Sequence, residues 1–173
     1  IDGTGAARYA ADVAVTGDRI TLVARRSGSG VEPALAKRVI DATGKIVAPG
    51  FIDLHAHLDP LPELPDAESA VRQGVTLALG GPDGTSPWPL ADYLREREKV
   101  GLGLNVAFLV GHNTIRRSVI GMAKRAPTSE ELARMRQMVA RGMGDGAWGL
   151  STGLKYLPGA WATTDEIVAL AQV

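Results

Sequence analysis

The sequence predicts an α/β protein, the first half of a (β/α)8 TIM-like barrel preceded by a small β domain. Short apolar runs bounded by turn signals make up residues 1–48. From Pro49 onward, short apolar runs alternate with helical patterns, as they do where helices connect parallel strands. Residues 49–173 hold four such βα units, whereas a closed barrel has eight and needs about 250 residues. We therefore expect a β segment over residues 1–48 and an incomplete barrel over residues 49–173.

Two pairs of short strands are expected in the β segment. The first pair is Val13–Val15 and Ile20–Val23, joined through a Gly-Asp turn signal. The second pair is Val39–Ile40 and Ile46–Val47, which flank a Thr-Gly dipeptide. The polar stretch "RRSGSGVEPALAKR" is the loop expected between them.

Four strands and four helices are expected in the barrel region. The strands are Phe51–His55, Val75–Leu79, Asn105–Val110 and Trp148–Thr152. The helices lie near Ala67–Gln73, Leu90–Val100, Ser129–Met143 and from Thr164 to the chain end. The last two open with Thr-x-x-Glu at Thr128 and Thr163, the pattern of a capping box. Leu132, Met135 and Val139 form an apolar stripe expected to pack onto a sheet.

Composition excludes several classes of function. The 173 residues are 45% hydrophobic, and 19 basic side chains balance 19 acidic ones, without a basic run. We therefore expect a small-molecule substrate rather than nucleic acid or a membrane surface, and oligomerisation stays open. The absence of cysteine excludes disulfides and zinc sites built on thiolates. No signal-peptide pattern is visible, which slightly favours the cytoplasm, although the chain begins with Ile1 rather than Met.

Two of the chain's 3 histidines close the apolar run "VAPGFIDLHAHLD". Residues two apart on a strand share a face, so His55 and His57 are expected together at its carboxyl end. Barrel enzymes build active sites at that end, and two imidazoles so placed can chelate one divalent cation such as zinc. The alternative is a pair of core or rim histidines with hydrogen-bonded ring nitrogens.

The same stretch resembles the first-strand signature of the amidohydrolase superfamily, metal hydrolases with a (β/α)8 barrel beside a β-sandwich. "IDGTG", "ADVAVTGDRI" and "RVIDATGKIVAPGFID" are similar to the lead-in of that sandwich. "VGHNTIRRSVIG" and "GAWGLSTGLKYLPGAWATTDEI" resemble the N-acyl-D-amino-acid deacylases, or D-aminoacylases, and the resemblance covers most of the chain. It implies a zinc-type centre of one or two divalent metals, with His55 and His57 as ligands. It also implies hydrolysis of N-acyl-D-amino acids to a carboxylate and a D-amino acid.

Two other functions remain open. One is a related amidohydrolase that acts on cyclic amides or dipeptides, as dihydroorotases, hydantoinases and isoaspartyl dipeptidases do. The other is a noncatalytic barrel that serves as a scaffold. Because the resemblance places further ligands and a catalytic aspartate on later strands, residues 1–173 alone are expected to be inactive.

The chain departs from the better-known deacylases, which carry a metal-binding cysteine after the second strand. Here "GVTLALG" runs into "GPDGTSPWP", without a cysteine. Lys155, after the fourth apolar run, is the residue we expect to compensate. Many superfamily members carry a carboxylated lysine there that bridges two metals, and a poorly solvated pocket near cations favours the neutral amine which carboxylation needs. Asp83 is expected to form the turn before Gly84, with metal or substrate binding as its alternatives.

Further residues have roles that the resemblance implies. His112 and Arg116, in "GHNTIRR", are expected to contact the substrate. His112, at the end of the third strand, is expected to serve catalysis as well, as a contact to the substrate or to its oxyanion, and not as a metal ligand. Arg116 has the alternatives of orienting a loop, pairing with a carboxylate or making a surface salt bridge. Tyr156 is expected to donate a hydrogen bond to the scissile carbonyl. Asp59 is expected beside the metal-binding histidines, and Ser151 in tight strand-end backbone.

Overall fold

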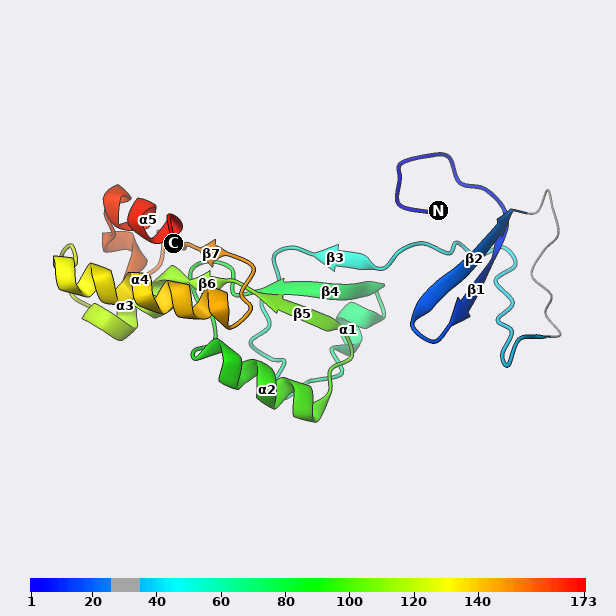
Figure 1. Ribbon diagram of the computed structural model, residues 1–173, viewed down its shortest axis with the longest axis horizontal. Coiled ribbons are helices and arrows are strands. Elements are labelled where there is room, and N and C mark those ends of the chain that lie inside the picture. Colours follow the sequence, from blue (N-terminus) through cyan, green and yellow to red (C-terminus); the bar gives the residue numbers. More distant parts are fainter. Residues whose placement is uncertain (26–34) are drawn as a thin grey trace. The chain divides into compact units, whose positions relative to one another are not determined.

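The computed structural model describes residues 1–25 and 35–173, which form two compact units, Ile1–Pro49 and Gly50–Val173 (Figure 1). In the first unit, β1 (Ala11–Thr16) pairs antiparallel with β2 (Arg19–Arg25). Both strands were expected from their apolar runs, and the pair is confirmed. Most of the polar loop expected after β2 falls on residues 26–34, outside the described residues.

The second expected strand pair was wrong, since residues 39–40 and 46–47 belong to no strand. The turn between them does form, because the amide of Lys45 donates to the carbonyl of Ala42 over 2.9 Å. The flanking apolar runs, however, are two residues long, and their side chains are 52–72% exposed. A ladder of two residues a side that buries so little does not hold in water.

The second unit carries two parallel sheets, as the alternation of strands and helices predicted. β3 (Phe51–Asp53), β4 (Val75–Gly80) and β5 (Asn105–Phe108) lie in that order (Figure 1). β6 (Val110–Gly111) pairs with β7 (Leu150–Ser151). The amide of Leu109 donates to the carbonyl of Gly80 over 3.0 Å, which continues the pairing beyond β5. Because β3 and β4 run parallel, their carboxyl ends lie at the same edge of the sheet.

In the described part of the chain, five helices accompany these strands, and four of them pack on β5 and β6. They are α1 (Glu68–Val71), α2 (Leu90–Val100), α3 (His112–Ile120), α4 (Ser129–Gly144) and α5 (Thr164–Ala171), with a 3-10 turn η2 at Gly159–Trp161. The main core joins buried side chains of α2, α3, α4 and α5 to β5 and β6, with Phe108, Ile115 and Met135 among them. The expected stripe of α4 is confirmed, since Met135 and Val139 are buried.

Helix α3 was not expected, because its sequence, "HNTIRRSVI", has β-branched residues and no capping signal. The helix begins where its first backbone amides find a hydrogen-bond acceptor in a distant part of the chain. The backbone N–H groups of Asn113 and Thr114 donate to the carbonyl of Gly84, over 2.7 and 3.2 Å. No helix within residues 1–25 or 35–173 is long and apolar enough to cross a membrane.

Candidate metal centre

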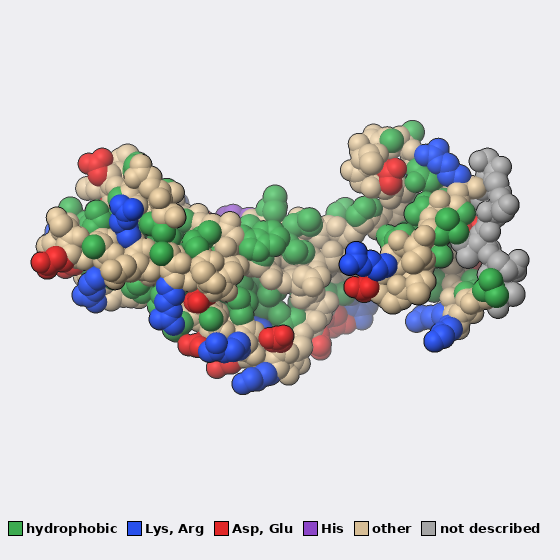
Figure 2. Space-filling model, viewed as in Figure 1, with side chains coloured by type: hydrophobic (Ala, Val, Ile, Leu, Met, Phe, Trp, Pro, Cys, Tyr) green, Lys and Arg blue, Asp and Glu red, His purple; other side chains and the backbone are tan. Residues whose placement is uncertain are grey.

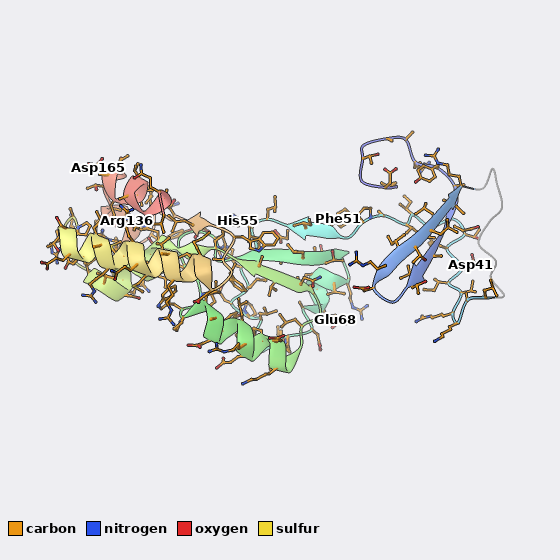
Figure 3. The ribbon with its side chains drawn as sticks, in the orientation of Figure 1. Asp41, Phe51, His55, Glu68, Arg136 and Asp165 are labelled. Atoms are coloured by element: carbon orange, nitrogen blue, oxygen red, sulfur yellow. The ribbon has the colours of Figure 1, made fainter. Side chains whose placement is uncertain are left out.

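His55 and His57 follow β3, two and four residues after the strand ends at Asp53, and Figure 3 labels His55 at this position. The segment stays beside β4, because the amide of the buried Ala56 donates to the carbonyl of Leu79 over 3.0 Å. The amide of His55 donates to Asp53 Oδ1 over 3.0 Å, which shapes the bend. Because Ala56 turns inward, both imidazoles turn outward, and their ring centroids lie 5.5 Å apart. The two histidines thus meet at the edge that the sequence predicted.

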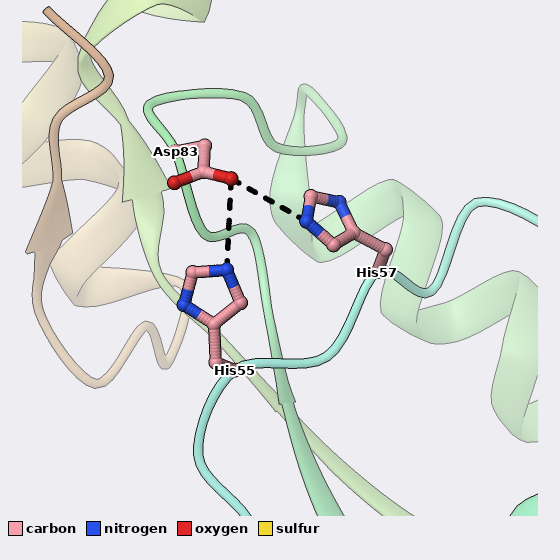
Figure 4. Close-up of side chains that lie close together, drawn as sticks. All are labelled: His55, His57 and Asp83. Atoms are coloured by element: carbon pink, nitrogen blue, oxygen red, sulfur yellow. Dashed lines mark ion pairs between the residues drawn. The ribbon is translucent and has the colours of Figure 1, made fainter.

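Asp83 brings a carboxylate to this pair. It stands in the turn after β4, where the amide of Thr85 donates to the carbonyl of Pro82 over 3.2 Å. Its Oδ2 lies 3.5 Å from Nε2 of His55 and 3.4 Å from Nε2 of His57 (Figure 4). All three ligand atoms fall within 4.8 Å of one another. The expected turn is present. The distances to the two histidines also agree with the alternative, in which Asp83 binds a metal.

The donor types fit a zinc ion, and so do the two separations between Asp83 and the histidines. Zinc binds imidazole nitrogen and carboxylate oxygen with bonds of about 2.0–2.2 Å, so neighbouring ligands of a tetrahedral site lie about 3.3 Å apart. Both distances from Asp83 to the histidines match that separation. In addition, Nδ1 of His57 lies 3.9 Å from Asp59 Oδ2, so the expected neighbour is present at ion-pair distance but not at hydrogen-bond distance.

A pocket of about 580 Å³ opens beside these groups. His57, Asp59 and Asp83 line one side of it, and Tyr93 and Phe108 stack edge-to-face on another, with ring centroids 5.4 Å apart. Burial raises the pKa of Tyr93, so its phenol stays protonated over a wider range. The pocket therefore joins candidate metal ligands to an apolar wall, as sites for small organic molecules commonly do.

Tyr156 and Lys155 lie in the turn that follows β7. Tyr156 lines the same pocket as His57 and Asp83 and is 53% exposed. Lys155, next to it, is exposed. The expectation that this loop reaches the histidines is met for Tyr156, and the roles of both residues stay predictions.

His112 and Arg116 occupy a different environment from the one expected. His112 opens α3 instead of closing a strand, and both side chains are fully buried. Nε2 of His112 lies 2.8 Å from Oε1 of Glu166, and Arg116 donates to Oε2 of the same carboxylate. Arg116 also donates to the carbonyls of Ala123 and Arg125, over 3.3 and 2.6 Å. Of the alternatives for Arg116, carboxylate pairing and loop orientation are found, and the surface salt bridge is wrong.

The profile of the amidohydrolase family matches residues 38–171. The chain belongs to the amidohydrolase family. Among its relatives, a D-aminoacylase of Alcaligenes xylosoxydans xylosoxydans is 36% identical, over 99% of this chain and 40% of that protein. An N-acyl-D-glutamate deacylase of the same organism is 37% identical, over 100% of this chain and 39% of that protein. The resemblance to D-aminoacylases is thereby confirmed.

A solved amidohydrolase has the same fold over this region. The crystal structure of N-acyl-D-glutamate deacylase from Bordetella bronchiseptica, in complex with zinc and a phosphonate inhibitor, matches 99% of this chain with a TM-score of 0.88 and 35% identity. The match covers 40% of that chain. This amidohydrolase chain therefore spans about two fifths of the length of the relatives it matches.

The sequence analysis missed the side-chain contacts of three residues in or near the candidate site. Asp83 was assigned mainly to a turn, although it stands in the loop where the expected cysteine was missing. Glu166 was assigned to a capping box, but its carboxylate turns to α3 instead. The hydroxyl of Thr163 does accept from the amide of Glu166 over 3.2 Å, so half of that box forms. Ser151 was assigned to strand-end backbone without a role for its hydroxyl.

Proposed function

We propose that the protein containing this chain is a metal-dependent hydrolase that cleaves the amide bond of N-acyl-D-amino acids, giving a D-amino acid and a carboxylate. The observation that carries the proposal is the convergence of His55, His57 and Asp83 at one edge of a parallel sheet. Similarity to two named D-amino-acid deacylases along the whole chain supports the substrate class.

We further propose that the four βα units belong to a (β/α)8 barrel and that residues 1–48 belong to a β-sandwich. The parallel order of β3, β4 and β5 supports the barrel, because sequential parallel strands joined by helices are its repeating unit. The candidate metal centre at their carboxyl edge supports it as well, since barrel enzymes place active sites there.

Each side chain has a distinct role in this proposal. His55, His57 and Asp83 would hold a zinc ion, which when bound polarises a carbonyl oxygen and lowers the pKa of water. Tyr156 would donate a hydrogen bond to the amide carbonyl as charge develops on its oxygen. The aromatic and apolar wall of the pocket would exclude water from part of the substrate and fix its orientation.

Lys155 has a proposed role in a two-metal form of the centre. Its carboxylated amine would supply a second carboxylate, shared between two cations. Tyr156 supports this proposal because it brings the same turn to the candidate ligands, whereas Lys155 itself is exposed and would have to turn toward the pocket that Tyr156 lines. His112 and Arg116 would act on the substrate only indirectly, by holding α3 in place.

The test is amine release by the full-length protein loaded with zinc, with matched N-acetyl-D- and N-acetyl-L-amino acids as substrates. A hydantoin and an isoaspartyl dipeptide are assayed alongside, to represent the related hydrolases. We expect turnover of the D-isomers alone, its loss on chelation and its return with added zinc. His57→Asn should abolish it, because the imidazole ligand is gone.

Glu63→Gln is the matched control, since this exposed side chain lies in the same loop and is no candidate ligand. It should retain full activity. Equal turnover of L-isomers, or turnover that survives chelation, contradicts the proposal. Turnover of the hydantoin or the dipeptide alone assigns the protein to the related hydrolases instead.

A further inference from the structure

The loop that carries Asp83, residues Gly81–Ser86, turns sharply and makes its holding contacts with segments far away in the sequence. Gly81, Asp83 and Gly84 all have positive φ angles, of 76°, 56° and 78°. For Asp83, which has a Cβ, this left-handed region is uncommon and costs energy. Its amides and carbonyls bond to β7 and α3, so the position of the carboxylate depends on these contacts.

Ser151 supplies two of those contacts through one hydroxyl. Its Oγ donates to the carbonyl of Gly81 over 2.5 Å and accepts from the amide of Gly84 over 3.1 Å. These partners lie about seventy residues earlier in the chain, on either side of Asp83. The hydroxyl is buried, so water does not replace it readily when it is removed. One side chain of β7 thus closes the loop around the candidate ligand.

The neighbouring elements leave little freedom to compensate. A Cβ on Gly153 would lie 1.9 Å from the carbonyl oxygen of Asp83, so the backbone after β7 touches the loop directly. On the other side, the first amides of α3 bind the carbonyl of Gly84, and Thr114 Oγ1 accepts from the amide of Ser86 over 3.0 Å. The loop is therefore fixed on two sides, and Ser151 is the side chain that spans Asp83 itself.

We propose that Ser151 is a positioning residue for the metal centre, which sets the affinity for zinc by holding Asp83 against His55 and His57 through the backbone of its loop. This inference rests on the proposed metal site, and it extends to a residue that touches neither metal nor substrate. On this proposal, the serine of the strand-end tripeptide "STG" supports metal binding and is not a nucleophile.

The test compares two substitutions of nearly equal shape in the full-length protein. Ser151→Thr keeps the hydroxyl, and Ser151→Val replaces it with a methyl group. Zinc affinity is measured by competition with a chromogenic chelator, independently of any deacylase activity. We expect Ser151→Val to bind zinc about 10–100-fold more weakly than Ser151→Thr, the loss typical of groups that orient a metal ligand.

A second background tests the route through Asp83. In Asp83→Asn, which keeps the shape and a weaker oxygen ligand, the difference between valine and threonine should disappear. Ser118→Ala is the control, because that exposed hydroxyl bonds only within α3, to the carbonyl of Thr114 over 2.9 Å. It should leave zinc affinity unchanged. If Ser151→Val does not fold, as judged by the circular dichroism of the zinc-free protein, Ser151→Ala compared with wild type takes its place.

Equal zinc affinity of the valine and threonine variants overturns the inference. So does a difference of the same size in the Asp83→Asn background, because Ser151 would then act by another route. Failure of the proposed deacylase activity is a separate result, since zinc binding is measured without a substrate.

Discussion

At the scale of single residues, Asp83 satisfies two requirements at once. Aspartate tolerates the left-handed backbone of the turn, with φ at 56°, and its carboxylate can also serve a metal. The turn propensity was readable from the sequence, because Gly84 follows it. The approach to His55 and His57 was not readable, since it depends on how β3 and β4 pair. Asp83 thus forms the turn and also places its carboxylate beside the two histidines.

Substitutions of Asp83 and Lys155 should affect zinc binding differently. Asp83→Asn should lower zinc affinity more than tenfold, over 1.4 kcal/mol, because an anionic ligand becomes a neutral one.

Lys155→Ala should lose one zinc of a two-metal centre, and a short carboxylic acid should restore part of the lost zinc binding. Zinc content and affinity of the full-length variants measure both effects. Unchanged zinc content and activity in Lys155→Ala would contradict the proposed carbamate.

The buried cluster of His112, Arg116 and Glu166 predicts a large effect on stability. Glu166→Gln removes the charge opposite a guanidinium that is fully buried. Breaking a buried ion pair in this way costs roughly 3–5 kcal/mol, because the remaining charge loses its partner. Denaturant unfolding of the full-length protein measures the loss. Asp165→Asn, an exposed neighbour on α5, should lose much less, and equal losses would show that the pair contributes little.

At the scale of elements, predictability followed the local signals. Helix α2 has the bounds that its pattern predicted, and α4 begins at its predicted capping box. Helix α3 was missed because its start is stabilised by the carbonyl of Gly84, twenty-nine residues before Asn113 and beyond any sequence window. Short strands were predictable where their apolar runs reached a sheet. The runs at residues 39–40 and 46–47 did not, and they stayed outside strands.

The start of α4 should make stability depend on acid pH. Glu131 accepts two hydrogen bonds from Arg125 and one from the amide of Thr128, and these lower its pKa from 4.5 to about 2. A carboxyl with a lowered pKa stabilises the folded state above its unfolded pKa, and this contribution is lost as pH falls from 4.5 toward 2. Glu131→Gln should therefore lower the melting temperature at pH 7, and the gap should narrow below pH 4.5.

The exposed Glu130, on the same turn of α4, offers the matched control. Glu130→Gln should show a smaller difference from wild type at pH 7. Thermal unfolding of full-length wild type, Glu131→Gln and Glu130→Gln across pH 3–7 distinguishes the effects of the two substitutions. A gap for Glu131→Gln that stays constant over this range would mean that its charge is not what stabilises α4.

At the scale of the whole molecule, the second unit leaves its edge strand β3 exposed. Green hydrophobic side chains reach the surface of this unit in Figure 2. Along and just after β3, Phe51, Ile52 and Leu54 are 64%, 59% and 70% exposed. Parallel sheets are ordinarily covered on both faces, and β3 is also an edge strand whose unpaired backbone groups invite association. The parallel order was predictable from the sequence, whereas the segment that would cover β3 was not.

The polypeptide of residues 1–173, produced alone, should therefore bind the dye ANS and self-associate, because its exposed apolar strand lacks a partner. The double variant Ile52→Ser and Leu54→Ser should reduce both signals, measured by fluorescence and by light scattering. Leu64→Ser is the control, since that leucine is 65% exposed but lies outside the sheet. A monomeric polypeptide that binds no dye would contradict this prediction. If the loss of association follows β3 and not Leu64, the exposed edge strand is the surface through which the polypeptide associates.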